Sequence, residues 1–147
     1  MIVKDKRIIT TVYNGAPAGM RTCAEKGECL RRKMNIPSGT HAEICYAAHA
    51  EQNAILQAAK LGISIDGATL YCTHQPCSMC AKMIINAGIR RVVYREGYPD
   101  AFSLELLEEG KVQYDVSLRA SHTLSTQEIL LFFNNREDVL NVSVVTP

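Results

Sequence analysis

The sequence lacks the features that mark membrane proteins and nucleic-acid-binding proteins. No apolar run approaches the ~20 residues that a helix needs to cross a bilayer. The stretch from Met1 to Arg7 carries charges where a secretory signal would be apolar. The formal net charge is +1, which provides no attraction to nucleic acid or to an anionic membrane. We therefore expect a cytoplasmic protein with no membrane partner and no nucleic-acid partner.

Internal repeats, low-complexity tracts and domain linkers are also missing from the 147 residues. A chain of this length and ordinary apolar content is most simply one domain, 1–147, with a substantial core. Six cysteines are present, and Cys72, inside an apolar stretch, is predicted to belong to the core. Because there is no secretory signal, and because Cys77 and Cys80 form Cys-x-x-Cys, metal binding is a better interpretation than disulfides.

Hydrophobic periodicity and turn residues predict the element order β-β-α-β-α-β-α-β. The later β-α-β units indicate a partly parallel sheet with helices packed against it, and therefore an α/β fold. The tail is predicted to hold a helix at 125–133 and an edge strand or partner-binding arm at 139–145. The other predicted strands are 1–3, 8–13, 68–73, 91–94 and 111–116, and the other predicted helices are 40–61, 78–87 and 101–109.

Two short motifs carry the chemistry, His49-x-Glu51 and Pro76-Cys77-x-x-Cys80. A catalytic zinc takes three protein ligands, often His and Cys, and leaves its fourth position to water. A carboxylate two residues from a ligand can serve that water as a proton shuttle. Each motif alone is more often a solvated helix face, a redox pair or half of a structural site. Together, in this order, they match the signature of zinc nucleobase deaminases.

The spacing of His49 and Glu51 makes a further structural prediction. Successive residues of a helix are about 100° apart, so these two side chains do not share one helix face. They flank one metal if the predicted helix breaks near 46–48 and His49 stands close to a new N-terminus. Cys77 and Cys80 also lie at a helix start. Both ligand sets then sit at helix N-termini, where the helix dipole favours thiolate over thiol.

Three stretches resemble the deoxycytidylate (dCMP) deaminase family: Tyr13-Asn14-Gly15-Ala16-Pro17, residues 49–55 and residues 73–89. The similarity runs from about residue 1 to residue 116. It implies a three-layer cytidine-deaminase-like α/β fold, with a mixed five-stranded sheet, helices on both faces and a core of about 1–118. The helix that family members place before the first strand is missing here, and the tail 119–147 is unassigned.

The resemblance implies zinc-dependent hydrolytic deamination of dCMP to dUMP. His49, Cys77 and Cys80 would hold the catalytic zinc. Glu51 would be the catalytic residue, giving a proton to ring N3 of cytosine and moving one to the departing amine. The expected partner is therefore a small-molecule nucleotide.

Substrate contacts follow from the same resemblance. We expect Asn14 to bind the sugar or phosphate, His74 to form the pocket floor and Tyr98 to line the base pocket. The alternative for Asn14 is a turn residue that satisfies its own backbone, and for His74 a hydrogen-bonded residue at a strand end. A phosphate favours Arg or Lys, and Arg21 and Arg95 are both candidates.

A second set of metal-ligand residue types lies in and just after the long polar segment 21–39. It consists of Cys23-x5-Cys29 followed by His41-x3-Cys45, whose spacing fits one helical turn. Some dCMP deaminases carry a structural zinc in this insertion, so the resemblance favours a second zinc here. The alternative is that these are free cysteines.

Other functions stay open. A zinc-stabilised binding module would use both Cys/His sets structurally, but it has no need of Glu51 beside an open zinc position. Among enzymes, the alternatives are deamination of adenosine in transfer RNA, whose enzymes share Met79, and of free nucleosides. Relatives are commonly hexamers and many are regulated by dCTP and dTTP. A homo-oligomer with these allosteric effectors is therefore expected.

Overall fold

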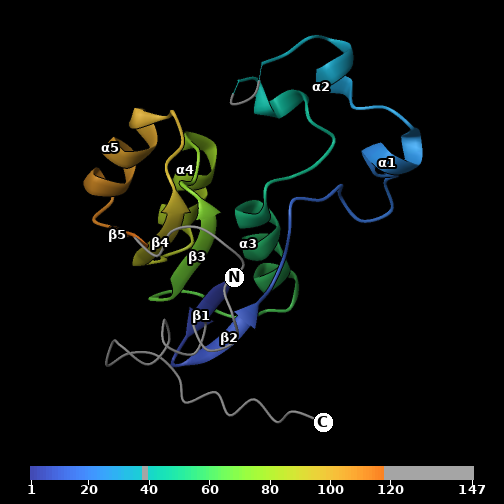
Figure 1. Ribbon diagram of the computed structural model, residues 1–147. Coiled ribbons are helices and arrows are strands. Elements are labelled where there is room, and N and C mark those ends of the chain that lie inside the picture. Colours follow the sequence, from blue (N-terminus) through green and yellow to red (C-terminus); the bar gives the residue numbers. More distant parts are fainter. Residues whose placement is uncertain (38–39, 118–147) are drawn as a thin grey trace, which may run out of the picture.

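The structure is a computed structural model and describes residues 1–37 and 40–117. Figure 1 shows the predicted order of strands and helices. Two short α-helices and one 3-10 helix precede the first long helix. The predicted tail elements at 125–133 and 139–145 lie outside the described residues. The strands are β1 (Ile2–Lys4), β2 (Arg7–Thr10), β3 (Thr69–His74), β4 (Arg91–Glu96) and β5 (Gln113–Val116), and the helices are α1 (Cys23–Lys26), α2 (Leu30–Lys33), a 3-10 helix (Ala42–Ile44), α3 (Ala50–Lys60), α4 (Ser78–Asn86) and α5 (Ala101–Glu109).

The strands form one mixed sheet in the order β2-β1-β3-β4-β5. β1 pairs antiparallel with both β2 and β3, whereas β3, β4 and β5 run parallel. The register places Leu70 beside Val92 and Val92 beside Tyr114, so one row of side chains crosses the sheet. Parallel neighbours need a crossover connection, which α4 and α5 provide. The predicted α/β class with a mixed five-stranded sheet is confirmed.

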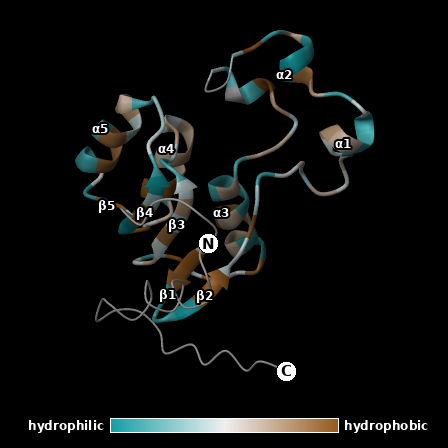
Figure 2. Cartoon of the chain, in the orientation of Figure 1, coloured by the Kyte–Doolittle hydropathy of each residue, from teal (hydrophilic) through white to brown (hydrophobic). Residues whose placement is uncertain are grey.

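The main core lies between this row of side chains and the helices. Ile2, Leu70 and Val92 of the sheet are at most 1% exposed. α3 contributes Ala54 and Ala58, which lie on one helix face because they are four residues apart. In Figure 2 the strands β1 and β2 stand out as apolar segments. The alanines of α3 allow a close approach of helix and sheet, which fixes the position of the helix start.

The helix predicted over 40–61 is interrupted, as a metal site shared by His49 and Glu51 requires. A 3-10 turn covers Ala42–Ile44, and α3 begins only at Ala50, with His49 as its N-cap residue in an extended conformation. The predicted break near 46–48 is therefore confirmed. α3 has 11 residues, and none of the helices within 1–37 and 40–117 is long and apolar enough to cross a membrane.

The strand predicted over 8–13 is wrong in its last three residues, because β2 ends at Thr10. The chain then follows the start of α3. The side-chain amide of Asn53 donates a hydrogen bond to the backbone carbonyl of Tyr13 at 3.1 Å. Local β-propensity at 11–13 is overridden by this contact with a helix that lies 40 residues further along the chain.

Residues 16–47, called the arm below, leave the domain and return to it at one point. Gly15 N donates to Ala48 O at 3.2 Å, and Ala48 N donates to Gly15 O at 2.9 Å. Figure 1 shows α1 and α2 of the arm lying away from the sheet. α1 begins with a complete capping box of Thr22 and Glu25. Local capping therefore gives this polar segment a helix that hydrophobic periodicity does not reveal.

Two glycines that end helices provide a matched test of the packing. Gly62 after α3 and Gly88 after α4 both have positive φ, +67° and +74°. A Cβ atom on Gly62 would meet nothing within 4 Å, whereas one on Gly88 would overlap the Asp66 carboxylate and lie 3.2 Å from Asp66 Cα. Only glycine adopts this conformation without strain.

We expect Gly62→Ala to lower the free energy of unfolding by about 1–2 kcal/mol, the cost of a left-handed conformation. Gly88→Ala should cost about 1–3 kcal/mol more, because overpacking against Asp66 adds to the same strain. Urea unfolding of the two variants measures the difference. Equal losses in both variants would mean that Asp66 moves aside freely.

Candidate metal centre and active site

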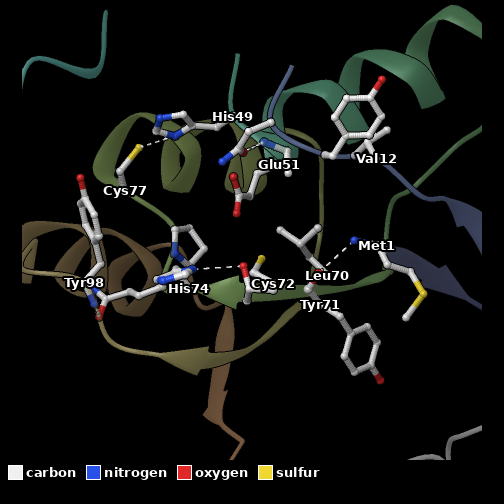
Figure 3. A pocket seen from close by; sticks show the side chains of 16 residues that line it. Met1, Val12, His49, Glu51, Leu70, Tyr71, Cys72, His74, Cys77 and Tyr98 are labelled. Atoms are coloured by element: carbon white, nitrogen blue, oxygen red, sulfur yellow. Dashed lines mark hydrogen bonds between the residues drawn. The ribbon is translucent and has the colours of Figure 1, made fainter. Parts of the chain in front are cut away.

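Two helix starts meet beside the C-terminal end of β3 (Figure 3). His49 is the N-cap residue of α3, Cys77 is the N-cap residue of α4, and Cys80 lies in the first turn of α4. His49 Nδ1 is 3.4 Å from Cys77 Sγ and 3.4 Å from Cys80 Sγ. Among the described residues, these are the only three or more potential metal ligands whose donor atoms all lie within 4.8 Å of one another.

This geometry fits a zinc ion. With Zn–N near 2.05 Å and Zn–S near 2.3 Å, tetrahedral N and S ligands lie about 3.6 Å apart, close to the 3.4 Å found between His49 and each cysteine. Three protein ligands leave one position open for water or substrate. His49 and Cys77 line the neighbouring cavity, whereas Cys80 is fully buried. The open position is therefore reached from the cavity.

The two thiols of the site differ in their affinity for protons. Hydrogen bonds from Cys80 and His49 lower the pKa of Cys77 to about 4, so Cys77 is a thiolate at neutral pH. The pKa of Cys80 is raised, because its proton is shared with Cys77 and because the thiol is buried. The hydrogen bond with Cys77 also raises the pKa of His49. The metal-free site thus holds protons that a bound cation displaces.

Glu51 points into a cavity of about 710 Å³ beside the three ligands (Figure 3). It lies in the first turn of α3, and its Oε2 is 3.7 Å from Cys80 Sγ. The carboxylate is therefore next to the ligand set but is not a member of it. At this position it can exchange protons with a molecule held at the open coordination position.

Cys72 also faces this cavity, which corrects its prediction as a plain core residue. It packs against the core, yet it lines the cavity and interacts with Glu51. Burial, followed by the charge of Glu51, raises the pKa of the Cys72 thiol, so the thiol stays protonated. The period of two in β3 already indicates this position, because Leu70, Cys72 and His74 share one face of the strand.

The three predicted substrate residues, Asn14, His74 and Tyr98, all line the cavity. Asn14 Oδ1 accepts a hydrogen bond from Ala50 N, the first amide of α3, at 2.7 Å. His74 Nε2 lies 3.3 Å from a carboxylate oxygen of Glu96. Figure 3 shows Tyr98 on the same side of the cavity as Cys77, across from Val12. The structure brings Asn14, His74 and Tyr98 together from β3 and from the segments that follow β2 and β4.

The lining of the cavity, as far as the chain is described, includes neither lysine nor arginine. Arg21 belongs to the arm and is exposed. Arg95 Nε donates to Glu96 Oε1 at 3.0 Å, and its side chain is about half exposed. Neither predicted phosphate ligand therefore lies in the cavity wall.

The four residues predicted to hold a second zinc are not gathered like His49, Cys77 and Cys80. Cys29 interacts with Cys23, and hydrogen bonds from the backbone of Arg32 lower the pKa of Cys29. The other two residues have different partners: His41 Nδ1 lies 3.0 Å from Glu43 Oε1, and Cys45 Sγ accepts a bond from Ala47 N at 3.4 Å. Within the described chain, no three of the four form a ligand group.

A buried polar cluster, which was not predicted from the sequence, lies next to Pro76 and the start of α4. Gln75 and Ser103, 7% and 0% exposed, hydrogen-bond to each other at 2.9 Å. Gln75 Nε2 also donates to Asp100 O at 2.8 Å, and Gln75 Oε1 accepts from Tyr98 N at 3.4 Å. A glutamine immediately before Pro76, at the end of a buried strand, is the one signal in the sequence that indicates such a cluster.

The fold is a mixed sheet with helices, and a histidine, two cysteines and a free carboxylate lie at the starts of two of these helices. This combination defines the zinc-dependent nucleobase deaminase class. The family model for the cytidine and deoxycytidylate deaminase zinc-binding region matches residues 1–96. The chain belongs to this family.

Known relatives extend this match over more of the chain. ComE operon protein 2 of Bacillus subtilis is 39% identical over 137 residues, which cover 92% of this chain and 64% of that protein. Deoxycytidylate deaminase of Schizosaccharomyces pombe is 37% identical over 114 residues, 77% of this chain and 35% of that enzyme. The chain thus spans less than two thirds of the length of these relatives.

The crystal structure of dCMP deaminase from cyanophage S-TIM5 in complex with dCMP and dUMP aligns with a TM-score of 0.61. The sequence identity is 33%, and the alignment covers 79% of this chain and 77% of that one. This likeness supports the predicted three-layer cytidine-deaminase-like fold class.

Proposed function

We propose that this protein catalyses the zinc-dependent hydrolytic deamination of dCMP to dUMP. The observation that carries the proposal is the position of Glu51. Its carboxylate lies in the cavity, 3.7 Å from Cys80 Sγ, beside three ligands that leave a coordination position open. A purely structural zinc site is closed by four ligands and needs no such carboxylate.

The residues of this chain would divide the reaction between them. His49, Cys77 and Cys80 hold the zinc, which when bound supplies a nucleophilic water by lowering its pKa to about 7. Glu51 would take a proton from the water and give it to ring N3 of cytosine. It would then carry the second proton of the water to the amine, which leaves C4 as ammonia while the water oxygen becomes the new oxygen on C4. Cys72, a protonated thiol that also lines the cavity, interacts with Glu51.

Two findings support a cytosine nucleotide as the substrate. The S. pombe relative is named a deoxycytidylate deaminase, and the cyanophage neighbour is described in complex with dCMP and dUMP. The cavity of about 710 Å³ is within the size range of sites for small molecules. In this proposal Asn14, His74 and Tyr98 contact the nucleotide, and Arg21 or Arg95 reaches its phosphate from outside the cavity wall.

Ammonia release from a panel of substrates tests the proposal. The zinc-loaded protein should release ammonia from dCMP faster than from deoxycytidine, adenosine or transfer RNA. Preference for an adenine compound would move the protein to the adenosine branch. A zinc-loaded protein that releases ammonia from none of these compounds would be a zinc-stabilised binding module instead.

We also propose a second, structural zinc bound by Cys23, Cys29, His41 and Cys45 of the arm. The support is the donor chemistry of the four side chains and the interaction of Cys23 with Cys29. Metal analysis should find about two zinc ions per chain, a number that follows from one closed and one open site. Cys23→Ser/Cys29→Ser should lose one of them and keep the other. A single zinc in both proteins would contradict the second site.

We further propose that the protein is a homo-oligomer, that it is located in the cytoplasm, and that dCTP and dTTP regulate it. Exposed apolar side chains beside the site, Tyr13 at 81% and Met79 at 57%, support contacts between subunits. Light scattering gives the mass of the assembly. Saturation curves for dCMP with and without each triphosphate test the regulation, and unchanged curves would exclude it.

A further inference from the structure

The two zinc helices begin in an unusual way. The first amides of a helix lack partners within the helix, and the side chain of the N-cap residue normally accepts from one of them. At α3 and α4 the N-cap residues are His49 and Cys77, whose donor atoms face each other at 3.4 Å. Cys77 makes no side-chain cap bond. α4 therefore lacks a cap from its own N-cap residue, whereas at α3 Gln52 Oε1 accepts from His49 N at 2.9 Å, in a capping box with His49.

At both helices a remote side chain accepts a hydrogen bond from the first amide. Ala50 N, the first amide of α3, donates to Asn14 Oδ1 at 2.7 Å. Ser78 N, the first amide of α4, donates to Asp100 Oδ2 at 2.7 Å. The caps are 36 and 22 residues away in sequence from the amides that they bind. We call Asn14 and Asp100 the remote caps.

Asp100 is itself firmly held. It is the N-cap residue of α5, and its Oδ1 accepts from Ser103 N at 3.1 Å. Its backbone carbonyl accepts from Gln75 Nε2 and from Ser103 Oγ, both at 2.8 Å. One carboxylate therefore caps two helices at once and is fixed by a buried polar cluster. Ser78 follows Cys77 directly, so the position of Asp100 determines that of the ligand loop.

We propose that Asp100 is a positioning residue, which holds the Cys77–Cys80 turn in the geometry that binds zinc by capping α4 at Ser78. Asp100 does not line the cavity, so it acts through the ligand loop and not on the substrate. Asn14 performs the corresponding task for His49 from the cavity side. The proposal rests on the proposed function of His49, Cys77 and Cys80 as zinc ligands.

The test measures zinc affinity by competition with a chromophoric chelator, in full-length protein carrying Cys23→Ser/Cys29→Ser so that zinc in the arm is not counted. Outer partners of metal ligands typically contribute about 10–100-fold to metal affinity. We expect Asp100→Ala to bind zinc about 10–100-fold more weakly. Asp100→Asn should lose less zinc affinity, because its amide oxygen still accepts a hydrogen bond. The Ser78 amide should also exchange its hydrogen faster in both variants.

Gly62→Ala is the matched control, because it lowers stability and leaves both remote caps in place. It should bind zinc like the unsubstituted protein. Equal zinc affinity in all variants, with zinc present at His49, Cys77 and Cys80, would overturn the positioning role alone. A parent protein that binds no zinc at these three residues would overturn the proposed function as well. If Asp100→Ala does not fold, Asp100→Asn decides the question.

Discussion

Glu51→Gln is expected to bind zinc like the unsubstituted protein and to lose about 10²–10⁴-fold in kcat, the usual contribution of a general acid-base residue. Glutamine has nearly the same shape as glutamate but cannot carry a proton between two atoms of a substrate. Glu51 is not one of the three zinc ligands, so the metal should remain. Zinc content and the rate of ammonia release from dCMP are the two measurements.

Glu43→Gln serves as the control for Glu51→Gln. Glu43 is an exposed carboxylate that lies near His41 in the arm and does not line the main cavity. Its substitution should leave kcat unchanged. Normal turnover in Glu51→Gln would show that another group transfers the protons, and loss of zinc from this variant would show that Glu51 supports the metal directly.

Cys80→Ala is expected to abolish zinc binding at the active site and, with it, turnover. Removing an outer partner typically costs about 10–100-fold in metal affinity, and removal of a ligand must cost more. Cys80 is fully buried behind His49 and Cys77, so water cannot easily replace its sulfur. A chelator of moderate strength should remove the zinc from the variant but not from the unsubstituted protein.

The control for Cys80→Ala is Cys72→Ala, which removes a thiol from the same cavity but is not a member of the ligand group. It should keep the zinc. Retention of zinc by Cys80→Ala would mean that His49, Cys77 and a third, different group bind the metal. Loss of zinc in Cys72→Ala would place Cys72 among the ligands.

Local rules predicted the parts of this molecule that depend on neighbouring residues. The bounds of α5 follow from helical periodicity between Pro99 and Gly110 and agree with the structure. The break before α3 followed from chemistry: His49 and Glu51 serve one metal only at a helix start. The ligand group itself was predicted from spacing, and the structure brings its three members together.

Long-range contacts limited the remaining predictions. The end of β2 at Thr10 depends on contacts with α3, which no local propensity contains. The remote caps, Asn14 and Asp100, are defined by bonds to amides 36 and 22 residues away. Asn and Asp are common in turns for local reasons, so their long-range role cannot be recognised from the sequence. The capping of α1 is local but leaves no hydrophobic pattern.

The paired backbone hydrogen bonds of Gly15 and Ala48 have a consequence for how this domain can change. The arm begins and ends at neighbouring points, so its length is decoupled from the position of His49, which directly follows Ala48. Doubling the length of such a loop costs only about 0.6 kcal/mol in closure entropy. The segment between Gly15 and Ala48 can therefore be exchanged for another sequence, or lengthened, while His49 and the start of α3 keep their positions.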